Sequence, residues 1–129
     1  MGSAYALTGR SILVVEDEPL ISLEMTAIFE AAGAKVMVAR TPAEAIRFVE
    51  ERDVSAAVLD FGLGGDSVST VCGHLRERDI PFMFYTGHGH VQGSYPDAVV
   101  VEKPASGNTL LTAMAALGVT RTETIAAAI

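Results

Sequence analysis

Five polar side chains follow short apolar runs along this chain, and their types are those that handle phosphate and hard cations. Glu16 and Asp17 follow the run ILVV, and Asp60 follows AAVL. Thr86 ends the run FMFYT, and Lys103 follows AVVVE. Oxygen ligands without a cluster of His or Cys favour Mg²⁺. A carboxylate can also attack phosphorus to form an aspartyl-phosphate. The set therefore indicates chemistry on a phosphoryl group.

The apolar runs must bring these side chains together. The run at residues 12–15 does not alternate with polar residues, which predicts an inner strand of a parallel sheet with both faces covered. The carboxyl ends of such strands share one rim, where ligands bind in open α/β sheets. Three carboxylates about 4 Å apart would repel by roughly 4 kcal/mol per pair. A proton, the Lys103 ammonium or a bound cation must offset that repulsion.

Helical segments separate the runs. The first helix ends at Gly33. The second begins with Thr41 as N-cap and Pro42 at its first position, and Glu44 completes a capping box. The last helix has Ser106 as N-cap. The apolar stripe of the first helix is Ile21, Met25, Ile28, Phe29 and Ala32, that of the third is Val68, Val71, Cys72 and Leu75, and that of the last is Leu110, Ala113, Met114 and Leu117. The fourth helix is weak, because each of its three glycines between residues 87 and 93 costs about 1 kcal/mol relative to Ala.

This alternation predicts the fold and its limits. Five βα units and right-handed crossovers favour a flavodoxin-like, doubly wound (βα)5 fold with a five-stranded parallel sheet in the order 2-1-3-4-5. We expect a flexible leader at residues 1–8, one domain at residues 9–117, and a tail or helix extension at residues 118–129.

Composition excludes several classes of function. The formal net charge is −7 and there is no basic cluster, which argues against binding of nucleic acid. Nowhere do 18 apolar residues run together, so we expect no membrane segment. The single cysteine, Cys72, cannot form an internal disulfide, which indicates a reducing, cytoplasmic location. It lies on an apolar stripe, which predicts a buried thiol.

The ordered motifs VVEDE, VLD, FYTG and VEKP resemble those of a known family. The chain is similar, over about residues 9–117, to the receiver domain of bacterial two-component response regulators. FYTG also resembles the Phe-x-Thr-Gly pattern of a subgroup of stand-alone receivers. The resemblance implies a phosphorelay module that takes a phosphoryl group onto Asp60 from a histidine kinase or phosphotransfer protein. Such a module is not an enzyme beyond its own phosphorylation and dephosphorylation.

The resemblance also implies roles for single residues. Asp17, Asp60 and the backbone carbonyl of Gly62 would ligate Mg²⁺, and Glu16 would act through a metal-bound water. Thr86 would sense the phosphate beside Lys103, and the bond from Lys103 to Pro104 would be cis. Phosphorylation would switch binding to an unknown downstream protein, and the chain would be a monomer or a weak dimer.

Two departures from the family bear on switching. The segment DFGLGGDS is glycine-rich where many receivers have Met-Pro, and Val100 stands three residues before the lysine, where many have Tyr or Phe. Because valine is short and stiff, we expect an order–disorder transition of residues 87–93 in place of movement of an aromatic ring.

Other functions stay open at this point. A non-phosphorylated binding module of the same fold is the strongest alternative, because an intact acidic site does not prove its use. A receiver fragment of a larger hybrid kinase or regulator would have the same sequence. A phosphatase is disfavoured because Gly62 stands where a general acid is expected. Flavin binding is disfavoured by acids at the first strand end, and His88 and His90 lack a third ligand for a metal.

Overall fold

A computed structural model of the chain describes residues 6–60, 65–87, 95 and 98–120. The elements within these residues alternate along the chain, and they are, in order, β1 (Ser11–Val15), α1 (Pro19–Ala31), β2 (Lys35–Ala39), α2 (Pro42–Glu51), β3 (Ala56–Leu59), α3 (Gly65–Glu77), β4 (Phe82–Thr86), β5 (Val99–Glu102) and α4 (Gly107–Ala116).

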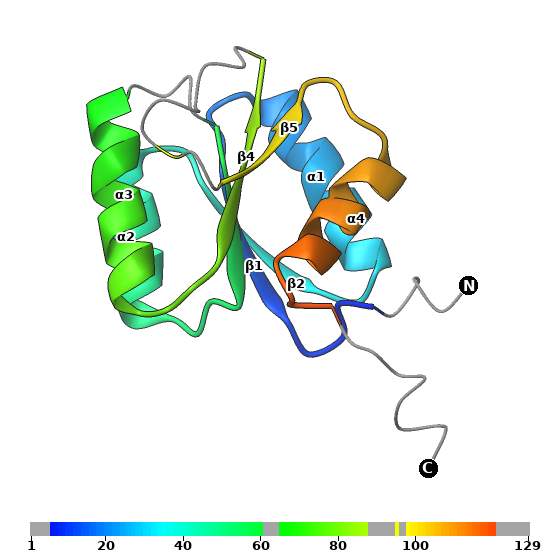
Figure 1. The fold of residues 1–129 in the computed structure, drawn as a ribbon, viewed down its shortest axis with the longest axis horizontal. Helices are drawn as coiled ribbons and strands as arrows, with labels where there is room; N and C mark the ends of the chain where they lie inside the picture. Colours follow the sequence, from blue (N-terminus) through cyan, green and yellow to red (C-terminus); the bar gives the residue numbers. More distant parts are fainter. Residues whose placement is uncertain (1–5, 61–64, 88–94, 96–97, 121–129) are drawn as a thin grey trace.

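The five strands form one parallel sheet in the order β2-β1-β3-β4-β5, which confirms the predicted topology. Helices α1 and α4 lie on one face of the sheet, and α2 and α3 lie together on the other (Figure 1). The helix expected around residues 87–93 falls almost wholly outside the described residues, as does the switch proposed for it.

The core consists of two layers because successive residues of a strand face opposite sides of the sheet. In β1, Ile12 and Val14 pack with the layer under α1 and α4, whereas Leu13 and Val15 pack with the layer under α2 and α3. All four side chains are at most 2% exposed. Burial of both faces explains why the run has no polar alternation.

The predicted helix starts are confirmed, with one difference in detail. The Thr41 hydroxyl accepts a hydrogen bond from the backbone N–H of Glu44 at 3.1 Å, and the Ser106 hydroxyl accepts one from Thr109 at 3.1 Å. The Glu44 carboxylate accepts from the N–H of Arg40 at 2.8 Å, one residue before the N-cap that a capping box would use.

The packed part of the chain is longer than the predicted residues 9–117. Leu7 is fully buried and its backbone N–H donates to the carbonyl of Ala32 at 2.8 Å, so it belongs to the core rather than to a flexible leader. At the other end Val119 is 8% exposed, and its carbonyl accepts from Nε of Arg10 at 2.7 Å. Residues 1–5 and 121–129 lie outside the described residues.

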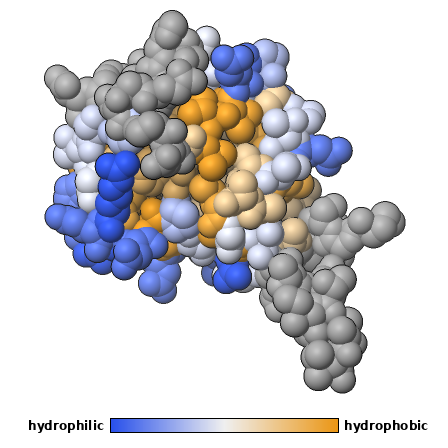
Figure 2. All heavy atoms as spheres, in the orientation of Figure 1, coloured by the Kyte–Doolittle hydropathy of each residue, from blue (hydrophilic) through white to orange (hydrophobic). Residues whose placement is uncertain are grey.

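Polar and apolar residues separate on the surface. Figure 2 shows hydrophobic residues gathered over β5 and α4, and hydrophilic ones over α3. Strand β5 is an edge of the sheet, and Val99 and Val100 on it are only partly buried. Among the described residues, no helix combines the length and the apolar character that crossing a membrane requires.

Replacement of Gly33 tests the turn that joins α1 to β2. Gly33 has φ +102, and a Cβ there would lie 2.5 Å from Oγ1 of Thr8. We expect Gly33→Ala to lower the free energy of unfolding by about 1–2 kcal/mol through backbone strain and by about 1–3 kcal/mol more through overlap.

Gly118→Ala is the matched control, because Gly118 has φ +82 and a Cβ there would meet nothing within 4 Å. It should show only the backbone part of the loss in urea unfolding. An equal loss in both variants would contradict the steric account of Gly33.

Candidate functional site

The polar residues at the strand ends are placed by continued pairing of the backbone. Beyond the strands, the N–H of Glu16 donates to Ala39 at 2.9 Å and the N–H of Asp60 donates to Val15 at 3.2 Å. These bonds fix the first residue after β1 and after β3 at the same rim. The predicted meeting of Glu16 and Asp60 is therefore confirmed by the sheet register.

Lys103 joins the two carboxylates. Its Nζ lies 2.9 Å from Oε1 of Glu16 and 2.9 Å from Oδ2 of Asp60. The side chains of Glu16, Asp60 and Lys103 are 0%, 11% and 16% exposed, so these ion pairs are largely shielded from water. Of the three ways to offset the carboxylate repulsion, the structure shows the ammonium.

Asp17 completes an acidic cluster with Glu16 and Asp60. One carboxylate oxygen of each residue lies within 4.8 Å of the others, and Asp17 is exposed. This all-oxygen set suits a hard cation such as Mg²⁺, which takes one or two carboxylates and keeps several waters. Gly62, the fourth predicted ligand, lies outside the described residues.

Glu16 is held from two sides. Oε1 accepts from Lys103, and Oε2 accepts from the backbone N–H of Glu18 at 3.1 Å. Burial raises the pKa of Glu16 above its ordinary value, although both hydrogen bonds act in the opposite direction. For Lys103, burial alone would lower the pKa, but the bonds to Asp60 and Glu16 outweigh it and raise the pKa. Lys103 is therefore held in its charged form beside Glu16 and Asp60.

Thr86 ends β4 at the same rim. It is fully buried, it lies opposite Glu102 in the register, and its carbonyl accepts from the backbone N–H of Lys103 at 3.0 Å. The next peptide bond, from Lys103 to Pro104, is cis, as the family resemblance implied.

The sequence reasoning missed one neighbour of Lys103. Tyr85 is 2% exposed, its hydroxyl accepts from the N–H of Ala105 at 3.1 Å, and its ring centroid lies 5.6 Å from Nζ of Lys103. The signal in the sequence is the bulky aromatic residue directly before the threonine in FYTG.

Cys72 does not belong to the acidic cluster, because it packs in the layer of the core under α2 and α3. Cys72 is 1% exposed, and burial raises the pKa of its thiol, which confirms a buried rather than a reactive cysteine. His88 and His90 lie outside the described residues.

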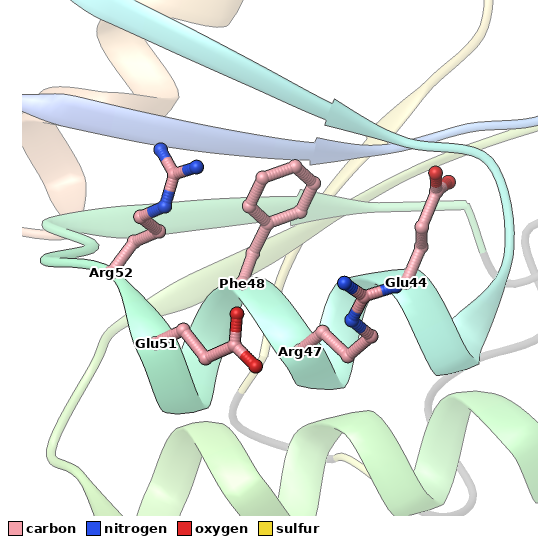
Figure 3. A pocket seen from close by; sticks show the side chains of 5 residues that line it. All are labelled: Glu44, Arg47, Phe48, Glu51 and Arg52. Atoms are coloured by element: carbon pink, nitrogen blue, oxygen red, sulfur yellow. The ribbon is translucent and has the colours of Figure 1, made fainter.

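A separate pocket lies on α2 (Figure 3). Its lining residues are Glu44, Arg47, Phe48, Glu51 and Arg52. It carries charges of both signs, and none of its residues belongs to the acidic cluster.

Removal of the Lys103 ammonium should destabilise the protein. In Lys103→Met, Glu16 and Asp60 lose a cation at bonding distance, and we expect a loss of about 1–3 kcal/mol at neutral pH with a chelator present. The pKa of Glu16 should rise further above 4.5, so the folded variant would bind more protons than the unfolded chain. Its stability should then fall as the pH rises from 4.5 through the raised pKa.

Urea unfolding of the variant and the wild type between pH 4.5 and 8 measures this difference. Lys35→Met is the matched control, because Lys35 is the other lysine of the chain and is exposed on β2. If Lys103→Met followed the pH profile of Lys35→Met, the ion pairs would contribute nothing to the fold.

Comparison with solved structures agrees with this fold. SdrG from Pseudomonas melonis Fr1, solved in its BeF3-activated conformation, is 38% identical, with a TM-score of 0.72 over 87% of this chain and 97% of that one. The receiver domain of the PhyR response regulator of Erythrobacter litoralis has a TM-score of 0.72 at 24% identity over 87% of this chain and 92% of that one, which supports the fold alone.

Sequence comparison gives the family. The phyllosphere-induced regulator PhyR of Methylorubrum extorquens is 33% identical over 100 residues, which are 72% of this chain and 38% of the relative. The aerobic respiration control protein ArcA of Escherichia coli is 35% identical over 59% of this chain and 32% of its own length. The chain thus spans well under half of these relatives. The response regulator receiver domain model matches residues 12–115, and the chain belongs to that family of two-component signalling domains.

Proposed function

We propose that this receiver domain is a phosphoacceptor that takes a phosphoryl group onto Asp60 from a histidine kinase or a phosphotransfer protein. The observation that supports the proposal best is the placement of Lys103, whose ammonium bonds Asp60 and Glu16 at 2.9 Å each. An ammonium at this position can follow charge that develops on the transferred group.

The transfer balances without a further reactant. An oxygen of the Asp60 carboxylate attacks phosphorus, the O–P bond forms, and the N–P bond of the donor phosphohistidine breaks. The electron pair of that bond returns to the imidazole nitrogen of the donor, and the ring leaves as neutral imidazole, with a proton from solvent where its other nitrogen carries none. Lys103 donates to oxygens of the bound phosphoryl group, and the Thr86 hydroxyl donates to another.

The acidic cluster would hold Mg²⁺ for this step through Asp17, Asp60 and the backbone carbonyl of Gly62, with Glu16 acting through a bound water. When bound, the cation neutralises charge on the phosphoryl oxygens. Asp17 is exposed, so solvent reaches the cluster from its side. Glu16 is buried and fixed by Lys103 and by the N–H of Glu18, and it therefore orients the ammonium.

The output of the domain is contact with another protein. The relatives PhyR and ArcA are named as regulators, and members of the family are signalling modules. The net charge of −7 opposes binding to the phosphate backbone of nucleic acid. Phosphorylation would change the affinity for a downstream protein.

Asp60 should be the one residue that becomes phosphorylated. Incubation with acetyl phosphate and Mg²⁺ should add one phosphoryl group, and mass spectrometry should place it on Asp60. Asp60→Asn should abolish the signal because the amide is not a nucleophile of comparable strength. A chelator should abolish it as well, since the single Lys103 ammonium does not neutralise three carboxylates together with the charge of the incoming group.

Asp53→Asn is the matched control, because Asp53 is an exposed aspartate outside the acidic cluster. It should leave the labelling unchanged. Modification of Asp17 or of a histidine would contradict the assignment, and a wild-type protein that stays unlabelled would support the non-phosphorylated binding module instead.

A further inference from the structure

Tyr85 contacts Lys103 and the backbone that follows it, although it belongs to a different strand. It lies on β4, and its side chain packs in the layer under α1 and α4, 2% exposed. Phe84, the residue before it, packs in the opposite layer. Tyr85 therefore reaches the start of α4 from inside the core rather than from the surface.

The phenol makes a specific polar contact. A buried hydroxyl is costly without a hydrogen-bond partner, and this one accepts from the backbone N–H of Ala105 at 3.1 Å. Ala105 stands two residues after Lys103 and directly before the N-cap Ser106. The bond consequently fixes the short connection from β5 to α4 against β4.

The ring of the same residue lies beside the lysine head group. Its centroid is 5.6 Å from Nζ of Lys103, within the range of a cation–π contact. A lysine side chain has four rotatable bonds and loses rotamer entropy when it is held in one place. The Tyr85 ring beside the ammonium lowers the number of positions that the head group can take.

We propose that Tyr85 is a positioning residue for Lys103: its hydroxyl anchors the backbone at Ala105 and its ring borders the ammonium, so that Nζ is held between Glu16 and Asp60. The carbonyl of Thr86 holds the backbone N–H of Lys103 from the same strand. Strand β4 thus makes three contacts with this part of the chain. The Thr86 carbonyl bonds the backbone of Lys103, the Tyr85 ring borders its ammonium, and the Tyr85 hydroxyl bonds the backbone of Ala105 two residues later. The consequence for phosphate binding rests on the proposed function.

A simple core role for Tyr85 makes a different prediction. Phenylalanine would fill the same volume and keep the ring beside the ammonium, so Tyr85→Phe would leave Lys103 unchanged if only packing mattered. If the hydroxyl positions the connection, its removal must alter Lys103 itself.

The first experiment observes the lysine directly by NMR. The chain has two lysines, Lys35 and Lys103, so the side-chain ¹³Cε and ¹⁵Nζ signals are simple to assign. Tyr85→Phe should shift and broaden the Lys103 signals and leave those of Lys35 in place. Tyr85→Leu, which also removes the ring, should cause a larger change. Unchanged Lys103 signals in Tyr85→Phe would overturn the proposal.

The second experiment measures binding of beryllofluoride, a phosphate mimic, in the presence of Mg²⁺. The net worth of one hydrogen bond corresponds to about 2- to 12-fold in an equilibrium constant, and we expect Tyr85→Phe to weaken binding by that factor. An affinity equal to that of the wild type would overturn the proposal for Tyr85 and leave the phosphoacceptor proposal intact. A wild-type protein that does not bind the mimic would instead overturn the phosphoacceptor proposal, and the Lys103 signals would still decide the role of Tyr85.

Tyr95→Phe is the matched control. It also removes one tyrosine hydroxyl, which donates to Oγ of Ser69 at 3.0 Å, but Tyr95 packs in the opposite layer of the core, against Phe84. It should leave the Lys103 signals and the affinity for beryllofluoride unchanged. Equal effects of both substitutions would indicate a general loss of packing and would refute positioning by Tyr85.

Discussion

The double ion pair of Lys103 with Glu16 and Asp60 is the interaction on which the rest of the site depends. It joins residues that follow β1, β3 and β5, which are far apart in the sequence. Two shielded carboxylates at one rim would repel strongly without a cation. The fold must therefore deliver a lysine from β5 to the same rim, and the parallel register of the strands does so.

That register has a second consequence, because it decides which layer of the core each side chain enters. A shift of one residue would exchange the two faces of a strand. On β4, Met83 and Tyr85 face α1 and α4, and Phe84 faces the opposite layer. The alternation of side chains along β4, which buries Met83 and Phe84 on opposite faces of the sheet, also places Tyr85 beside Lys103. Core packing and the geometry of the site are in this way set by the same pattern.

Much of the fold could be predicted because it depends on local patterns. Unbroken apolar runs marked the strands, Thr41 and Ser106 marked helix starts, and the acids at the strand ends marked the rim. Burial of Leu7 could not be predicted, since this residue pairs with Ala32 at the C-terminal end of α1, a contact that no local pattern indicates. The bond from Ala105 to Tyr85 could not be predicted either, because it joins β4 to the connection between β5 and α4 through a side chain, and no spacing in the sequence encodes it.

The positions of the aromatic residues show how this chain departs from its family. Many receivers have an aromatic ring three residues before the lysine, where this chain has Val100 on β5. In the register Val100 lies opposite Phe84, and Val101 lies opposite Tyr85. The ring next to the lysine is thus supplied by the neighbouring strand, and it faces the layer under α1 and α4. Movement of Lys103 toward a phosphoryl group would therefore act on Tyr85 and on the start of α4 as well as on Glu16, because the lysine borders the Tyr85 ring and the Tyr85 hydroxyl bonds the backbone that follows the lysine.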